Sequence, residues 1–355
     1  KKTMAIRNYT YYGFTLSICS ICLERIDAKI VFQGNNVYML KNCLEHGTEK
    51  TLIATDIDYY KKTRNYIKPS DLPKKFNTEV HYGCPYDCGL CTDHEQHSCV
   101  SIVELTDRCN LTCPTCYAGS SPTYGRHRTL DEVKVMLDIV VESEGEPDII
   151  QLSGGEPTIH PQFFDILAYA KTLPIRHIMI NTNGVRLADD EGFAEELNEY
   201  MPGIEVYLQF DSFKEEVLIK LRGKDLVEKK QKALEKLEHF NIHSTLVTTL
   251  ERGQNNDEIG AIIDFALQYR CLRGVTFQPT QFAGRVEKFD PLKNKYTLTE
   301  VRQDILNQTD IFNENDIIPV PCNPDALAMA YALKLDGKTV PLTSMIDPEV
   351  FLNNT

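Results

Sequence analysis

The sequence predicts an α/β fold: a partial, TIM-like (β/α)6 barrel with a small metal-binding β domain before it and a C-terminal extension after it. Three observations predict this fold. Strand-like and helix-like stretches alternate six times between residues 101 and 278, which is typical of a parallel sheet. A strand-rich stretch with cysteine pairs comes first. Two cysteine triplets of one spacing then lie near the start of the alternation.

Composition and charge exclude several classes of function. The chain has 355 residues, 42% hydrophobic and 25% charged, which is ordinary for a globular protein. A net charge of −13 argues against nucleic-acid partners. No apolar run is long enough to span a membrane, and the first residues show no signal peptide. Twelve cysteines in repeated short spacings indicate metal sites rather than disulfides, so we expect a reducing, cytoplasmic location.

We expect four parts along the chain. They are a rubredoxin-like or zinc-ribbon metal-binding domain (1–60), a linker with an auxiliary iron–sulfur loop (61–100), the partial barrel (101–280) and the C-terminal extension (281–355).

The first part contains a predicted hairpin and a predicted metal site. Strand formers at 30–32 and 37–40 flank a polar Gly/Asn turn at 33–36. Two short pairs of ligands accompany the hairpin. Their spacing is typical of a zinc ribbon or rubredoxin-like knuckle, and either Zn²⁺ or mononuclear iron fits it. We expect a structural role for the four residues Cys19, Cys22, Cys43 and His46.

The second part carries the first cysteine triplet, in a loop rich in Gly and Pro. Cys84, Cys88 and Cys91 have a further cysteine nearby, Cys99. Four thiolates close an auxiliary [4Fe–4S] cluster, which can carry electrons or support a neighbouring domain. His94 or His97 could replace Cys99, but thiolate suits such a cluster better. A zinc site is the alternative.

The third part is the predicted barrel, and its chemistry should lie at the C-terminal ends of its strands. The expected strands are 101–106, 149–153, 177–181, 205–210, 243–249 and 274–278. The expected helices are 129–143, 161–172, 190–200, 227–240 and 256–269. In the extension we expect helices at 297–308 and 325–335, with a proline-rich turn at 319–324 between them.

The second triplet, Cys109, Cys113 and Cys116, follows the first barrel strand and has no fourth cysteine nearby. Three thiolates can hold three irons of a [4Fe–4S] cube and leave the fourth iron open to a small molecule. Tyr117 follows the third cysteine directly, and Gly154-Gly155-Glu156-Pro157 follows the next strand.

These two motifs, in this order, resemble the radical S-adenosylmethionine (SAM) superfamily over roughly residues 101–278. The resemblance implies that the open iron binds SAM and that one electron from the cluster cleaves SAM to a 5′-deoxyadenosyl radical, which abstracts hydrogen from substrate. It also implies a set of residues that contact SAM. We expect the backbone of Gly154 and Gly155 to approach the SAM ammonium and Glu156 to accept a hydrogen bond from it. Further candidates are Tyr117, Asn183, Gln209 and Asp211, of which Asn183 could instead serve a turn.

The whole layout is similar to one branch of radical SAM proteins that includes tetraether lipid synthase and proteins labelled dihydropterin methylases. The leading hypothesis is therefore C–C bond formation between lipid alkyl chains. The alternatives are radical methylation of a pterin-like small molecule and a non-catalytic iron–sulfur electron carrier. The enzyme hypotheses imply a lipid or small-molecule substrate and an external electron donor such as ferredoxin or flavodoxin. The lipid hypothesis also allows peripheral membrane contact.

Four remaining residues are interpreted from local context. Cys271 ends an amphipathic helix and is expected in the core, whereas Cys322 lies in an irregular segment and could be a catalytic cysteine or a cluster ligand. Relatives with a further cluster have more C-terminal cysteines than this chain. Arg222, with Gly223 and the run 224–230, is interpreted as a solvated helix start, and Arg285 as a contact to an anionic substrate group or a surface residue.

Overall fold

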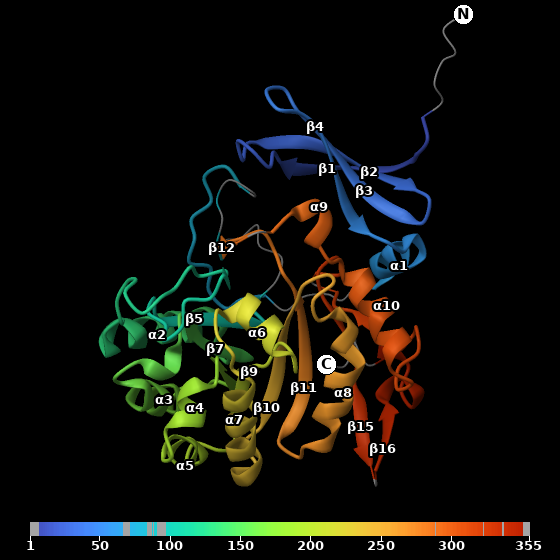
Figure 1. Cartoon of the computed structure of the whole chain (residues 1–355). Coiled ribbons are helices and arrows are strands. Elements are labelled where there is room, and N and C mark those ends of the chain that lie inside the picture. The colour runs from blue at the N-terminus through green and yellow to red at the C-terminus, as the bar shows by residue number, and fades with distance from the viewer. Residues whose placement is uncertain are drawn as a thin grey trace, which may run out of the picture. The chain divides into compact units, whose positions relative to one another are not determined.

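The computed structural model describes residues 7–66, 72–83, 87, 89–90, 97–287, 289–321, 323–335 and 337–350. The chain forms two compact units, which are described separately. Unit 1 joins Lys1–Lys68 to Tyr296–Thr355, and unit 2 is Pro69–Lys295. Both are drawn in Figure 1.

Unit 1 is built around an antiparallel four-stranded sheet in the order β1-β2-β3-β4. The strands are β1 (Thr10–Ile18), β2 (Arg25–Gln33), β3 (Asn36–Cys43) and β4 (Gly47–Ala54). The turn between β2 and β3 confirms the predicted hairpin, because Gln33 pairs with Asn36. A small core of Ile30, Val37, Ala54 and Tyr60 packs on one face.

The rest of unit 1 consists of short elements. Residues after the sheet form α1 (Ile57–Lys62) and η1 (Thr63–Asn65). The C-terminal segment forms α10 (Leu298–Gln308), β13 (Ile318–Pro319), β14 (Ala328–Met329), β15 (Ala332–Leu335), β16 (Lys338–Pro341) and η4 (Leu342–Ser344). A capping box at Thr297 and Glu300 starts α10.

The helix predicted at 325–335 is wrong. Ala328–Met329 pairs with β13, and Ala332–Leu335 forms a hairpin with β16. Alanine and leucine favour a helix locally, but pairing with the strand formers Thr339 and Val340 outweighs that weak preference.

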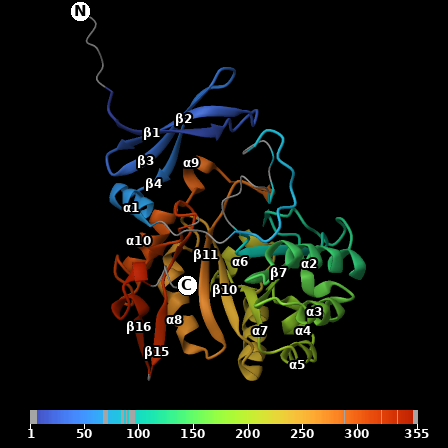
Figure 2. The ribbon, with the colours of Figure 1, turned by 180° about the vertical axis from the view of Figure 1, so that it is seen from behind.

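Unit 2 contains a six-stranded sheet in the order β11-β10-β9-β8-β7-β5, and all neighbouring strands are parallel. The two views in Figure 1 and Figure 2 show these strands following one another across the unit. The strands are β5 (Val100–Thr106), β7 (Ile149–Gly154), β8 (His177–Thr182), β9 (Ile204–Gln209), β10 (Ser244–Leu250) and β11 (Leu272–Pro279). Each lies within two residues of its predicted bounds, so the predicted partial α/β barrel with an N-terminal β domain is confirmed.

Helices cover one face of this sheet. They are α2 (Leu130–Glu144), α3 (Phe163–Thr172), α4 (Val185–Asp189), α5 (Phe193–Asn198), α6 (Glu215–Arg222), α7 (Val227–Phe240) and α8 (Ile259–Gln268), with η2 (Pro157–Ile159) and η3 (Asn256–Glu258) between them. The four-residue α9 (Pro291–Asn294) follows the last strand of the sheet. The core joins alternate strand residues such as Ile150, Ile180 and Val206 to the apolar stripes of α2, α3, α7 and α8. The sequence did not predict α4 or α6, which are short.

In the part of the chain that the structure describes, no helix is long and apolar enough to cross a membrane.

Candidate functional site

The loop that carries Cys109, Cys113 and Cys116, here called the cysteine loop, follows β5 at the C-terminal edge of the unit 2 sheet. Cys109 and Cys113 are buried, Cys116 is half-buried, and all three belong to one apolar cluster with Leu218 and Leu226. Burial raises the pKa of the Cys109 thiol to about 12 and also raises the pKa of Cys113. Bound iron favours the deprotonated thiolate, so this set of three soft ligands in an apolar setting suits an iron–sulfur cluster.

Gly154 and Gly155 bring the end of β7 against the start of the cysteine loop. The Gly155 amide donates to the Thr106 carbonyl at 2.7 Å, and the Glu156 amide donates to the Arg108 carbonyl at 2.9 Å. A Cβ added to Gly154 would lie 2.2 Å from the Thr106 carbonyl oxygen, and a Cβ added to Gly155 would lie 2.2 Å from the Arg108 carbonyl oxygen. The absence of a side chain therefore serves backbone packing here, whereas the sequence suggested an approach to SAM.

Glu156 lies at the centre of a buried hydrogen-bond network. Its carboxylate accepts from the Thr158 and Thr182 hydroxyls, both at 2.6 Å, and from the Thr158 and Asn183 amides at 3.2 and 2.8 Å. Burial raises the pKa of this carboxyl group, although each hydrogen bond opposes the rise. The four contacts occupy the carboxylate and join the ends of β7 and β8, so its side chain acts here as a link between strands.

Asn183 joins the end of β8 to the cysteine loop. Its Nδ2 donates to Asn110 Oδ1 at 2.7 Å and lies 3.9 Å from the Cys109 sulfur. Its Oδ1 accepts from the Val185 amide at 3.0 Å, so it also serves the turn into α4. The side chain thus has both a turn contact and a contact to a predicted cluster ligand.

Gln209 and Asp211, at the end of β9, contact Arg222. The Asp211 carboxylate is fully buried and accepts two hydrogen bonds of 2.7 Å from the Arg222 guanidinium. Burial disfavours ionisation of Asp211, but Arg222 holds its pKa below the usual range. With its amide turned so that the oxygen faces the guanidinium, Gln209 accepts from both terminal nitrogens of Arg222, at 3.0 and 3.1 Å.

The interpretation of Arg222 as a solvated residue is wrong, because its side chain is only 5% exposed. It also donates to the Thr249 hydroxyl at 2.7 Å and to the Thr115 carbonyl at 3.3 Å. It lies beside Cys113, where its charge opposes the rise in the pKa of that thiol. Arg222 therefore joins β9, β10 and the cysteine loop.

Arg285 holds the cysteine loop from its other side. Its guanidinium donates to the carbonyls of Cys113, Gly119 and Ser120 at 2.6, 3.1 and 2.7 Å. The short strand β12 (Arg285–Val286) pairs antiparallel with β6 (Thr115–Cys116). Both earlier interpretations of Arg285 are wrong, since its side chain is engaged with protein carbonyls. No sequence motif pointed to this contact across 165 or more residues.

The sheet face opposite the helices carries a group of uncharged polar side chains, which lie beside the carboxylates of Glu104 and Glu205. Asn181 pairs in register with Tyr207, and Tyr207 with Thr245, so their side chains share one face. Asn181 Nδ2 donates to the Ser153 hydroxyl at 3.1 Å, and Gln278 Nε2 to the Tyr207 hydroxyl at 3.2 Å. We call this the polar face, defined by Gln151, Ser153, Asn181, Tyr207, Gln209, Thr245, Thr276 and Gln278.

Three further residues singled out from the sequence are placed as follows. Tyr117 follows the cysteine loop and is 62% exposed. Cys271 is fully buried in the main core, as expected. Cys322 lies outside the described residues.

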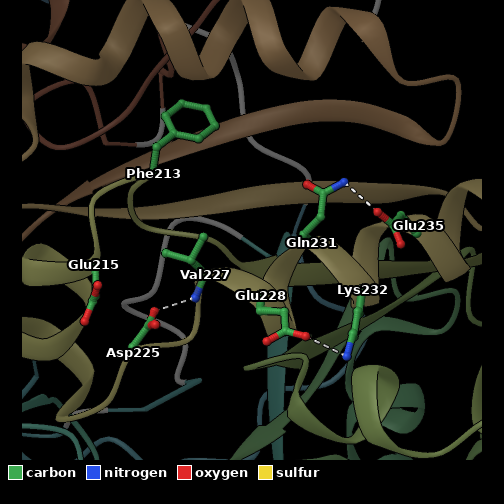
Figure 3. Close-up of a pocket in the computed structure, with 8 residues that line it drawn as sticks. All are labelled: Phe213, Glu215, Asp225, Val227, Glu228, Gln231, Lys232 and Glu235. Carbon is green, nitrogen blue, oxygen red and sulfur yellow. Dashed lines mark hydrogen bonds and ion pairs between the residues drawn. The ribbon is translucent and has the colours of Figure 1, made fainter.

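A surface hollow of about 580 Å³ lies beside the start of α7 and is shown in Figure 3. Four carboxylates and one ammonium group line it, and Glu228 pairs with Lys232 at 2.8 Å. The Asp225 carboxylate accepts from the Val227 amide at 3.0 Å, and Gln231 donates to Glu235 at 3.0 Å. The lining includes none of the residues predicted to bind a cofactor, so this hollow is separate from the candidate site.

Unit 1 brings together Cys19, Cys22, Cys43 and His46, whose ligand atoms all lie within 4.8 Å of one another. The Cys22 and Cys43 sulfurs are 3.9 Å apart, and His46 Nδ1 lies 3.5 Å from the Cys43 sulfur. A tetrahedron with Zn–S bonds of about 2.3 Å has edges of roughly 3.8 Å, which agrees with these separations. Backbone amides of Cys22 and Ile21 lower the pKa of Cys19 to about 7, which favours the thiolate ligand.

The auxiliary cluster prediction falls largely outside the described residues, which exclude Cys84, Cys88 and Cys91. Cys99 is described and exposed, and its sulfur lies 3.6 Å from His97 Nε2. His97 Nδ1 lies 3.4 Å from Glu144, so this imidazole is oriented by a carboxylate. The auxiliary cluster stays a prediction.

Comparison with known proteins identifies two parts of the chain. Residues 103–266 match the radical SAM superfamily, and residues 11–55 match the HMPTM N-terminal zinc ribbon domain. The chain is 33% identical over 365 residues to a protein of Methanocaldococcus jannaschii, the 7,8-dihydro-6-hydroxymethylpterin dimethyltransferase. That match covers 95% of this chain and 71% of the relative.

More distant matches cover about half of the proteins concerned. The GTP 3′,8-cyclase of Chlorobaculum tepidum is 30% identical over 180 residues, or 50% of this chain and 53% of the cyclase. The crystal structure of Streptococcus suis SuiB bound to S-adenosylmethionine matches 60% of this chain and 47% of that chain, with a TM-score of 0.49 and 17% identity. Together with the length of the match to the pterin enzyme, the two family matches show that this chain is a radical SAM enzyme and belongs to the group that carries an HMPTM zinc ribbon.

Proposed function

We propose that this enzyme methylates a small heterocycle of the pterin class. The observation that carries the proposal is the 33% identity to the pterin dimethyltransferase over 95% of this chain. Coupling of lipid alkyl chains, the leading hypothesis from the sequence motifs, has no support from the relatives described above.

The polar face also favours a heterocycle over an alkyl chain. In the described part of the chain the Gln151 amide has no hydrogen-bond partner, and Asn181 Oδ1 and Gln278 Oε1 accept no hydrogen bond. An alkyl chain packed against free amides would leave them unsatisfied, at a cost of about 1–3 kcal/mol each. The amino and oxo groups of a pterin can donate to and accept from such amides.

The cofactors and the protein divide the work in this proposal. A cluster with SAM would supply one-electron cleavage of SAM and the abstraction of a hydrogen atom, and a separate one-carbon donor would supply the methyl group that is added to the heterocycle. Cys109, Cys113 and Cys116 would hold the cluster, while Gly154, Gly155, Glu156 and Asn183 set the strand ends around it. The electron would come from an external donor of the ferredoxin or flavodoxin type.

The test is an anaerobic assay with two substrates in parallel. The protein, reconstituted with iron and sulfide, receives SAM, dithionite, a filtrate of anaerobic cells as a source of methyl groups, and either 7,8-dihydro-6-hydroxymethylpterin or a lipid extract. We expect mass spectrometry to find pterin that has gained one or two methyl groups. Coupled alkyl chains together with unchanged pterin would contradict the proposal.

A substitution on the polar face tests directly whether this face binds the pterin. Gln151→Leu removes a free amide without breaking a contact within the protein, so we expect weaker pterin binding, by about 10- to 100-fold. Met179→Leu, at the position of the neighbouring strand that pairs with Gln151, is the control and should bind normally. Quenching of the protein's tyrosine fluorescence by the pterin measures both affinities. Equal affinities of the two variants would show that Gln151 does not belong to the substrate site.

A further inference from the structure

The interpretation of the run 224–230 as solvated is wrong for Lys230, a buried cation that none of the functions above uses. It lies in the first turn of α7 with 2% of its surface exposed. Its Nζ donates one hydrogen bond, of 2.8 Å, to the carbonyl of Asn183. Moving an ammonium group out of water is costly, so a buried lysine needs compensating negative charge.

The buried acids near Lys230 do not supply that charge by direct contact. Among the described residues, no carboxylate oxygen lies within ion-pair distance of its Nζ. Asp211 is paired with Arg222, and the Glu156 carboxylate is satisfied by hydroxyl and amide donors. Burial accordingly lowers the pKa of Lys230 to about 8, while Asp211, Cys113 and Glu156 oppose the fall.

Asn183, which Lys230 contacts, is itself in contact with the cysteine loop. The same Asn183 that accepts from Lys230 donates through Nδ2 to Asn110 and lies 3.9 Å from the Cys109 sulfur. Cys113 is also close enough to Lys230 to favour its charged form. Asn183 therefore links this uncompensated cation to the loop that carries Cys109 and Cys113.

We propose that Lys230 is a fixed positive charge that raises the reduction potential of the cluster held by Cys109, Cys113 and Cys116. Reduction adds one electron, supplied by an external reductant, and a nearby cation stabilises the more negative state. The effect is strong because a buried pair of charges is poorly screened by water and salt. Lys230 touches neither substrate nor SAM in this role and is an electrostatic positioning residue.

The direct test is a redox titration of Lys230→Met and Lys230→Gln. The amide introduced by Lys230→Gln keeps a donor for the Asn183 carbonyl, but both variants lack the charge. The titration follows the EPR signal that changes when SAM is added, because a cluster with an open iron gives that response. We expect a more negative midpoint potential in both variants, with the wild-type amount of SAM-responsive cluster.

The control is Lys229→Met, which removes a half-exposed ammonium paired with Asp189 one residue earlier on the same helix. Its potential should equal that of the wild type. An unchanged potential in Lys230→Met and Lys230→Gln at full cluster content would overturn the proposal.

A failure to bind the cluster is also informative. If both uncharged variants lose the cluster and Lys230→Arg keeps it, Lys230→Arg is titrated instead: a wild-type midpoint potential supports the proposal, and a more negative one contradicts it. If Lys230→Arg loses it as well, the residue serves packing and the proposal is wrong. The proposal depends on the three-cysteine cluster site and not on the pterin substrate. A SAM-responsive signal in the wild type tests that site separately.

Discussion

At the scale of single residues, Gly154 and Gly155 allow the end of β7 to pack against the start of the cysteine loop. Gly155 lies where the backbone of β7 meets that of the segment after β5, and the Arg108 and Asp107 carbonyl oxygens would be 2.2 and 2.9 Å from an added Cβ. Both atoms belong to the backbone and cannot rotate away. Any side chain here must separate the two strand ends that carry the cysteines and the Glu156 network.

We therefore expect Gly155→Ala to lower the free energy of unfolding by about 1–3 kcal/mol and to weaken cluster binding. Urea unfolding of the cluster-free protein measures the first effect, and the SAM-responsive EPR signal measures the second. Gly192→Ala is the matched control, because the nearest atom to its Cβ would be 3.9 Å away and its φ is −87°. Equal stabilities of the two variants would show that β7 can shift at little cost.

At the scale of elements, the pairing of β12 with β6 fastens the cysteine loop to the segment after β11. Arg285 adds three hydrogen bonds to loop carbonyls, and a Cβ on Gly284 would lie 2.1 Å from the Tyr117 carbonyl oxygen. The loop is thus held between the ends of β5 and β7 on one side and β12 on the other. Its cysteines are fixed in place by contacts outside the motif.

We expect Arg285→Met to leave the sheet folded but to speed the loss of the cluster to an iron chelator by at least several-fold. Three carbonyls lose their donor, so the loop opens more often. Arg273→Met is the control, since that arginine contacts His243 at the opposite ends of the strands. The same release rate in both variants would contradict the role assigned to Arg285.

The zinc ribbon offers a second prediction at this scale. The core of Ile30, Val37, Ala54 and Tyr60 is small, and a sheet with so small a core usually needs a metal for stability. We expect Cys43→Ser to lose zinc and to raise hydrogen exchange in β1–β4, while β7–β10 stay protected. Mass spectrometry of exchanged peptides measures both regions, and unchanged protection of β1–β4 without zinc would contradict the prediction.

Elements and motifs with a local signal were predictable from the sequence. The six strands follow from runs of apolar and β-branched residues, and α2, α7 and α10 from their periodicity. The spacing of the first cysteine pairs likewise indicated the set of four ligands that unit 1 brings together. What the sequence did not show are contacts between distant residues. Arg222 looks solvated because lysines follow it, yet it pairs with Asp211 on another element, and Arg285 gave no sign of its contact with residues 113–120.

At the scale of the whole molecule, the two compact units contain two different sets of metal-binding side chains. Unit 1 gathers four ligands for a single ion, and unit 2 presents three cysteines at the edge of a parallel sheet. A closed set of four suits a structural metal, whereas a set of three leaves one position for a small molecule. The chemistry of this enzyme therefore belongs to unit 2, where the polar face adjoins the strand ends.

The measurement that tests this account most directly is the formation of 5′-deoxyadenosine. Anaerobically reconstituted protein is incubated with SAM and dithionite, and the nucleoside is quantified by liquid chromatography and mass spectrometry. We predict that the wild type forms it and that Cys113→Ala, which removes one of the three ligands, does not. An equal yield from Cys113→Ala, or no product from wild-type protein whose cluster is intact, would contradict the assignment of this site.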